Sequence, residues 1–158
     1  MSSLLQPRRI AFTKVHVDVL PNGGMSDTMG TTITTGLNVG IDNTNPRHIV
    51  LKMLVKFAPV DGGKQYYRGE VEALANFDID PNMMPLEKAH RLAVINGASI
   101  LYGAIREMVT NITARSPLKM PLVLGAMNFV ESAEDLMGEI EKLRKSVQSE
   151  KHTHSATS

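Results

Sequence analysis

The sequence predicts one α+β domain, in which a four-stranded antiparallel meander sheet packs against a long helix and a shorter C-terminal helix. Two periodicities predict this fold. Hydrophobic residues recur at every second position in the first half of the chain, and at steps of three and four in the second half. The 158 residues and 42% hydrophobic content suit a single core. We expect the domain to span residues 1–147 and residues 148–158 to form a disordered polar tail.

Four segments alternate apolar and polar residues as strands do. In the first, Val15, Val17 and Val19 alternate with polar residues, and β-branched side chains favour strands. Clusters of Pro, Asn, Asp and Gly separate the segments, and such residues form turns. Short turns between consecutive strands predict a meander with one buried and one solvated face. The predicted strands are residues 10–20, 31–41, 49–57 and 66–79.

The long helix is predicted by apolar residues at steps of four and three over residues 94–112. Pro85 suits its first turn, where the missing N–H costs nothing. Gly97 and Gly103 interrupt the helix, and each weakens it by about 1 kcal/mol relative to alanine. They therefore predict a bend or the close approach of a neighbouring element.

The second helix is predicted to begin at Ser132, a capping residue followed three positions later by the acid Asp135. Its narrow apolar stripe ends at Val147. Polar residues fill the rest of the chain, which is why we expect a disordered tail there.

The charge balance and the absence of cysteine exclude several function classes. Lys and Arg number 17 against 16 Asp and Glu, so the charge balance gives no basis for nucleic-acid binding. Without cysteine there is no disulfide, thiolate zinc site or cysteine nucleophile. We see no secretory signal and no apolar run near the roughly 20 residues that span a bilayer. We therefore expect a cytoplasmic protein that does not insert into membranes.

The apolar pattern exceeds what a single small core would bury. Val50 and Leu54 lie on the predicted polar side of the third strand, and Ile95, Ile100 and Val109 lie outside the main helix stripe. A monomer would expose them as patches larger than soluble proteins usually show. The sequence therefore predicts a homo-oligomer.

Three groups of residues suggest chemistry only weakly. Asp78 and Asp80 could form the acid–base pair of a hydrolase, but a polar strand end is the strongly favoured explanation, because no third polar partner lies nearby in the sequence. His152 and His154 are too few for a zinc site. Gly62–Lys64 lacks the spacing of a phosphate loop and fits a hairpin turn. We expect no metal or cofactor, and the chain is predicted not to be an enzyme.

Several segments of the second half resemble the SecB family of protein-export chaperones. The helix segment around Tyr102 and Arg106 is similar to the family's helix motif, and a proline-containing loop ending in Asn128 and Phe129 follows it, as in the family. The resemblance covers residues 8–140. The similar segments are residues 12–14, 69–71, 99–107, 115–117 and 122–129.

The resemblance implies a dimer of dimers that binds unfolded polypeptides in surface grooves without ATP, and that in many members delivers them to the export motor SecA. The connector Asn22–Gly30 corresponds to the family's crossover loop, and Pro121–Phe129 with the second helix to the opposite groove wall. Methionine-rich walls suit varied clients because the thioether side chain is flexible. The expected client-binding residues are Met25, Met29, Leu122, Leu124, Met127, Phe129, Leu136 and Ile140.

The chain departs from the export branch where that branch contacts SecA. Acidic positions of the first strand are occupied here by Val15 and Val19, and only Glu70 matches, so Glu70 is the expected partner-binding residue. Gly103 replaces the family's helix proline, and the tail is not acidic.

Three functions follow, in order of preference. The first is an ATP-independent holdase for unfolded polypeptides. The alternative is an oligomeric adaptor or an antitoxin-guarding SecB-like protein that binds one dedicated partner and does not deliver to SecA. The last is a small hydrolase that uses Asp78 and Asp80.

Overall fold

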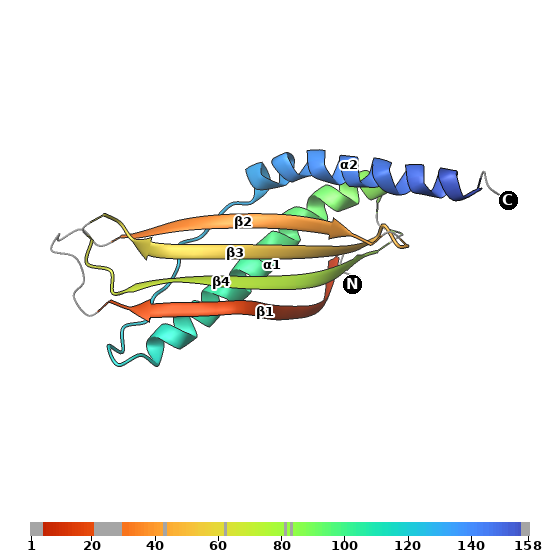
Figure 1. The fold of residues 1–158 in the computed structure, drawn as a ribbon. Helices are drawn as coiled ribbons and strands as arrows, with labels where there is room; N and C mark the ends of the chain where they lie inside the picture. The colour runs from red at the N-terminus through yellow and green to blue at the C-terminus, as the bar shows by residue number, and fades with distance from the viewer. Residues whose placement is uncertain are drawn as a thin grey trace.

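The chain forms a four-stranded antiparallel sheet with a long helix and a shorter one, as the sequence predicts (Figure 1). This computed structural model describes residues 5–20, 30–42, 44–61, 63–80, 82 and 84–155. The elements are β1 (Leu5–Val19), β2 (Thr31–Ile41), β3 (His48–Pro59), β4 (Tyr67–Ile79), α1 (Leu86–Ala114) and α2 (Val130–Ser155).

The strand order is β1-β4-β3-β2, which only partly agrees with a simple meander. Strands β2, β3 and β4 pair consecutively, as predicted. Strand β1 pairs antiparallel with β4, with Val15 opposite Val71, so β1 and β2 form opposite edges of the sheet. The connection between them must therefore cross from one edge to the other, as the family resemblance implies, and most of it lies outside the described residues. Alternation specifies which face a side chain occupies, whereas it does not specify the order of strands.

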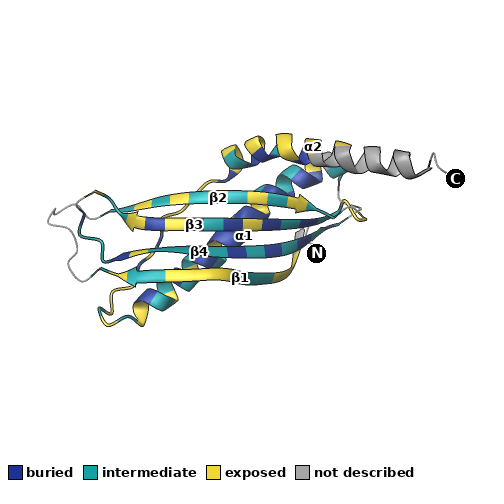
Figure 2. Ribbon diagram, in the orientation of Figure 1, coloured by how far each residue is buried: buried dark blue, intermediate teal, exposed yellow. Residues whose placement is uncertain are grey.

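One face of the sheet packs against α1 and the other face is bare, as Figure 1 shows with the bare face toward the viewer. The central strands β3 and β4 alternate buried and more exposed positions, while the edge strands are less buried (Figure 2). Each fully buried large apolar side chain contributes about 1.5–3 kcal/mol. The largest buried apolar side chains include Leu51, Met53, Phe57, Tyr67, Phe77, Leu101 and Ile105.

Helix α1 begins directly after Pro85 and crosses the sheet diagonally (Figure 1). Gly97 is the point of close approach: a Cβ there would meet Leu51 Cδ1 at 2.5 Å and the Phe77 ring at 3.1 Å. Gly103, in contrast, is exposed, with open space where a side chain would lie. The expected close approach is therefore confirmed at Gly97 and wrong at Gly103.

By length and composition alone, the α1 segment Lys88–Ala114 would be long and apolar enough to cross a membrane. The expectation that no such run exists is thus wrong. In this fold the segment is a core helix, with 44% of its apolar window buried inside the molecule. Core helices and membrane spans share this composition because both bury apolar side chains.

Helix α2 begins at Val130, so the predicted start at Ser132 is wrong. The side chain of Asn128 accepts a hydrogen bond from the Val130 N–H at 3.1 Å and so satisfies one of the free donors at the helix start. At its other end α2 continues to Ser155, through residues where we predicted a disordered tail. Gln148, Glu150 and Lys151 favour helix, which is consistent with this extension.

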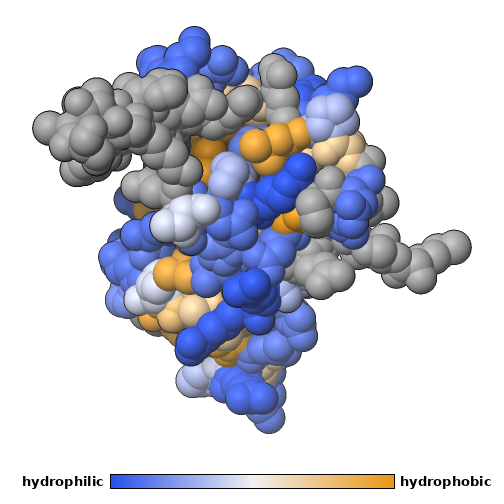
Figure 3. Space-filling view, turned by 90° about the vertical axis from the view of Figure 1, so that its right-hand side faces the viewer, coloured by the Kyte–Doolittle hydropathy of each residue, from blue (hydrophilic) through white to orange (hydrophobic). Residues whose placement is uncertain are grey.

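The single chain hides more apolar surface than the sequence predicts. Val109 is fully buried and Ile95 is half-buried within the single chain. Val50 and Leu54 are half-buried on the bare face, and Ile100 remains 37% exposed. Apolar side chains also reach the surface between hydrophilic ones at the end of the molecule shown in Figure 3. Oligomerisation therefore stays a prediction, and the exposed apolar surface that supports it is smaller than the sequence led us to expect.

Candidate polypeptide-binding site

The site is built on residues 120–129, here called the return loop, which connect α1 to α2 and run back along α1. A turn after α1 reverses the chain, with the Lys119 N–H donating to Ser116 O at 3.0 Å. Lys119 has a φ of 52°, a left-handed conformation that is uncommon for a residue with a side chain. The Tyr67 hydroxyl bonds Ser116 Oγ at 2.6 Å and donates to Thr113 O at 3.3 Å, which fixes the turn to the sheet.

Two threonines of α1 hold the first part of the return loop. The hydroxyl of Thr113 accepts the Leu122 N–H at 2.8 Å, and the hydroxyl of Thr110 donates to Leu122 O at 3.0 Å. Both backbone groups of Leu122 are therefore satisfied by side chains rather than by a neighbouring strand. Because buried polar groups need partners, these bonds allow the loop to lie against the core without regular secondary structure.

An arginine and a tyrosine one and two turns earlier on α1 hold the next part. Arg106 Nε donates to Leu124 O at 2.8 Å, and the Tyr102 hydroxyl donates to Gly125 O at 2.7 Å. Burial raises the pKa of the Tyr102 hydroxyl, so it stays protonated as a donor. The Tyr102 ring also meets the Phe129 ring edge-on, with centroids 5.6 Å apart. One helix thus fixes the return loop at four backbone groups, which are the amide and carbonyl of Leu122 and the carbonyls of Leu124 and Gly125.

Some apolar side chains of the return loop lie in the core, and others, together with that of Val130 directly after the loop, lie at the surface. Leu122 and Leu124 are buried, while Val123 between them is 63% exposed. Met120 and Met127 are exposed at 47% and 37%, and Val130 at the start of α2 is 37% exposed. A rigidly held backbone therefore presents apolar side chains to solvent.

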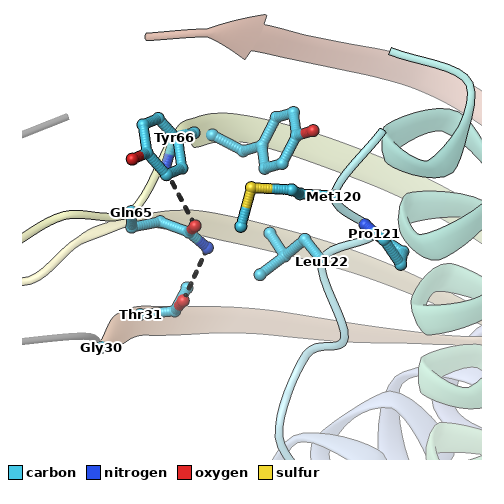
Figure 4. A pocket seen from close by; sticks show the side chains of 8 residues that line it. Gly30, Thr31, Gln65, Tyr66, Met120, Pro121 and Leu122 are labelled. Atoms are coloured by element: carbon cyan, nitrogen blue, oxygen red, sulfur yellow. Dashed lines mark hydrogen bonds between the residues drawn. The ribbon is translucent and has the colours of Figure 1, made fainter. Parts of the chain in front are cut away.

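A pocket of about 280 Å³ lies where the return loop begins (Figure 4). Its polar wall is organised by Gln65, which donates from Nε2 to Thr31 Oγ1 at 2.9 Å and accepts the Tyr66 N–H at 2.9 Å. Figure 4 shows Met120 and Leu122 on the opposite side from Gln65. The volume suits one or two apolar side chains of a ligand rather than a whole small molecule. The lining residues are Gly30, Thr31, Gln65, Tyr66, Tyr67, Met120, Pro121 and Leu122.

The structure divides the predicted client-binding residues into three groups. Leu122 lines the pocket and Met127 is exposed, so both are available to a ligand. Met25 and Met29 lie outside the described residues. Four others have side chains in the core, where they support the wall from behind and cannot touch a client without a rearrangement: Leu124, Phe129, Leu136 and Ile140.

Sequence reasoning missed several residues of this surface. Met120, Val123 and Val130 belong to a stretch, residues 120–130, whose only polar side chain is that of Asn128, so no alternation with polar residues shows which side chains face outward. The pocket residues Gln65 and Tyr66 lie directly before β4 and come near the return loop only through the fold. The one available indication in the sequence was Pro121, because the residue before a proline, here Met120, favours an extended conformation and so the start of an extended segment.

Glu70, the predicted partner-binding residue, lies on the bare face of the sheet, away from the return loop. It forms an ion pair with Lys14, and this bond chiefly holds the pKa of the Glu70 carboxyl below its usual range. The charge of Lys56 acts in the same direction. Glu70 is therefore an ionised but already paired carboxylate.

The two candidate hydrolase aspartates have separate structural partners. Asp78 accepts from His48 Nδ1 at 2.9 Å and pairs with Arg8, and these bonds lower the pKa of the Asp78 carboxyl, with the His48 bond contributing most. A general acid would need a raised pKa. The Asp80 carboxylate accepts the Asn82 N–H at 2.9 Å. Within the described residues, no group of three or more His, Asp or Glu side chains could hold a metal ion.

Comparison with known proteins gives the same fold. No known family profile matches the sequence, and no curated protein matches it. The SecB-like chaperone of Mycobacterium tuberculosis, solved in complex with a ChAD peptide from the HigA1 antitoxin, matches with a TM-score of 0.59 at 20% identity, over 78% of this chain and 90% of that chain. A protein of unknown function from Streptococcus agalactiae has a TM-score of 0.42 at 14% identity, over 77% of this chain and 97% of that chain. The chain therefore has the fold of a SecB-like chaperone.

Proposed function

We propose that this protein is an ATP-independent chaperone that holds non-native polypeptides on the return loop and in the adjoining pocket. One observation carries the proposal: α1 side chains fix the return loop at Leu122, Leu124 and Gly125, while Val123 and Met127 remain in solvent. Exposed apolar side chains on a rigid backbone lower the entropy cost of binding, because the protein does not have to order itself around the ligand.

The chemistry of this surface suits many sequences rather than one. Unfolded chains expose apolar side chains that folded proteins bury, and an apolar pocket beside polar backbone can accept them. Methionine side chains adapt to different shapes, which favours broad recognition. The two carboxylates of the candidate hydrolase site are already engaged, Asp78 in an ion pair with Arg8 and Asp80 in a hydrogen bond from the Asn82 N–H. A holding function therefore fits these residues better than hydrolysis.

The fold comparison supports the same class of ligand. The chaperone of Mycobacterium tuberculosis binds a peptide from an antitoxin, so this fold can hold a polypeptide segment. We infer a cytoplasmic homo-oligomer, a dimer of dimers by the family resemblance, that works without a cofactor. Export through SecA is the less supported branch, because Glu70 is already paired with Lys14.

A second candidate function is an adaptor that guards one dedicated partner, such as an antitoxin. The antitoxin peptide bound to the similar chaperone favours it. The two candidates differ in breadth: the holdase binds denatured proteins generally, whereas the adaptor binds one partner and ignores generic unfolded chains.

Light scattering of a chemically denatured enzyme tests the proposal. At a stoichiometric ratio the wild type should suppress aggregation, and Val123→Asp should suppress it much less, because a charge at the apolar surface opposes binding. Ala58→Asp, which adds the same charge at an exposed position of β3, is the matched control and should behave as wild type. A wild type that gives no suppression would contradict the holdase, and capture of one specific partner would then favour the adaptor.

A further inference from the structure

The bare face of the sheet carries an apolar strip that the proposed chaperone site does not use. The strip is made of Val50, Leu54 and Leu74, which are half-buried, with Gly36 opposite Leu54 and Gly40 opposite Val50. Leu74 lies opposite Lys52, between the positions of the other two, so the three side chains are diagonal neighbours. A Cβ at Gly36 would meet nothing within 4 Å, so the strip is open to solvent along β2.

Charged side chains surround the strip, and cations outnumber carboxylates. Four carboxylates of this face each have a cation partner: Asp18 with Arg68 at 3.1 Å, Glu72 with Lys52 at 2.9 Å, Glu70 with Lys14, and Asp78 with Arg8. Two more cations, Arg9 and Lys56, make no ion pair within the described part of the chain, although the charge of Lys56 also acts on the carboxylate of Glu70, which is already paired with Lys14. His16 lies near Asp18, at 3.2 Å.

The two unpaired cations lie near opposite ends of the strip. Lys56 follows Leu54 along β3 and lies opposite Glu70, while Arg9 lies opposite Asn76, in the same row as Val50. Lys56 lies six positions after Val50 in β3, which corresponds to about 20 Å. A segment of about six extended or thirteen helical residues would span this distance.

From this arrangement we propose that the bare face binds a short acidic segment of a partner protein, whose apolar side chains lie on the strip and whose carboxylates pair with Lys56 and Arg9. A second copy of this chain fits poorly, because two faces with an excess of the same charge repel each other. Nucleic acid also fits poorly, since Asp18, Glu70 and Glu72 lie among the cations and repel phosphates. An acidic, partly apolar peptide matches this surface both in charge, through the flanking cations, and in hydrophobicity, through the strip.

Fluorescence anisotropy with designed peptides tests this inference. The probe is a fluorescein-labelled peptide of about fourteen residues, with leucine on one helical face and glutamate near both ends, and its counterpart carries lysine in place of glutamate. The acidic peptide should bind, and its affinity should fall as the salt concentration rises, because salt screens the ion pairs. The lysine peptide should not bind. Lys56→Glu should weaken binding of the acidic peptide about fivefold to tenfold, because it replaces an attraction with a repulsion.

Two further variants separate charge from shape. Gly36→Val adds a side chain where space is open and suits a strand, so it should fold normally and weaken binding by occupying the strip. Lys88→Glu makes the same charge change at an exposed position of α1 and should leave binding unchanged. Circular dichroism verifies that each variant is folded.

Several outcomes would overturn the inference. They are equal binding of the acidic and lysine peptides, tighter binding of a DNA duplex, no binding of the acidic peptide, or equal effects of Lys56→Glu and Lys88→Glu. Loss of acidic-peptide binding in Val123→Asp would also overturn it, because the peptide would then occupy the return-loop surface. The result is independent of the chaperone assay, in which Lys56→Glu should behave as wild type.

Discussion

At the scale of single residues, two glycines of α1 have opposite surroundings. Gly97 faces Leu51 and Phe77 at distances that leave no room for a methyl group, whereas Gly103 faces open space. The sequence alone treats them alike, because both weaken a helix to the same degree. Their packing gives them opposite roles.

Alanine substitutions at these two glycines should therefore change stability in opposite directions. Gly97→Ala should lower the free energy of unfolding by about 1–2 kcal/mol, because overpacking outweighs the gain in helix propensity. Gly103→Ala should raise it by up to about 1 kcal/mol. Urea denaturation of both variants measures the difference. Changes of the same sign would show that the approach of α1 to the sheet is looser than the structure indicates.

A second residue-scale prediction concerns Asp78, whose carboxyl pKa is lowered mainly by the His48 bond, with Arg8 contributing. A pKa lowered in the folded state stabilises the protein above the ordinary aspartate pKa of about 3.9, and this stability is lost as pH falls through the lowered value. Asp78→Asn should therefore be less stable at pH 7 and lose less stability below about pH 4.

Thermal unfolding across this pH range measures the effect. Asp135→Asn, at an exposed position of α2, is the matched control. Parallel pH profiles for the wild type and Asp78→Asn would show that the cluster of Asp78, His48 and Arg8 does not stabilise the fold.

At the scale of elements, the return loop depends on α1 rather than on a strand partner. Four side chains of one helix bind its backbone, and two of these are threonines, which also bond their own helix. The single hydroxyl proton of Thr110 is shared between Leu122 O at 3.0 Å and Arg106 O at 2.9 Å, and the Thr113 hydroxyl donates to Val109 O at 2.8 Å. The loop is therefore ordered by polar contacts on one side and by buried leucines on the other.

Arg106→Leu tests this dependence. It removes the donor to Leu124 O and should lower the free energy of unfolding by about 1–3 kcal/mol, since a buried carbonyl loses its charged partner. Amide hydrogen exchange of residues 120–129 should accelerate more than that of β3. Arg91→Leu, which breaks only the exposed pair with Glu134, should cost about 1 kcal/mol or less. Equal exchange of loop and sheet would contradict the proposed role of Arg106.

At the scale of the whole molecule, an exposed stripe of α1 remains uncovered in the single chain. It includes Ile100, which is 37% exposed, beside the exposed Asn96 and Ser99. The inferred oligomer would cover this stripe, because exposed large apolar side chains next to small residues favour helix packing.

The mass in solution is therefore expected to be four times the chain mass of 17.3 kDa. Ile100→Glu should lower that mass, because a charge would be buried at the interface. Sedimentation equilibrium measures both proteins, and Glu107→Gln on the same exposed stripe is a control that buries no new charge. A monomeric wild type would contradict the oligomer and leave the fold unaffected.

How far the sequence predicts this molecule differs between its parts. The alternation of Ile49, Leu51 and Met53 predicts which face of β3 is buried, and the structure confirms it. It could not predict that β1 would lie beside β4, because an alternating strand can pair with any partner of matching face. The sequence could not predict the outward position of Val123 either, since its neighbours Leu122 and Leu124 are also apolar.

The sequence by itself determined the two-layer fold, because periods of two and of three to four residues fix which side chains each element must bury. Only the tertiary structure decided which apolar residues remain in solvent. Phe129 and Leu136 were expected at the surface and lie in the core, while Met120 and Val123 are exposed. The reason is that the return loop has no period of its own, so its orientation is set by hydrogen bonds to residues of α1 that are distant in sequence.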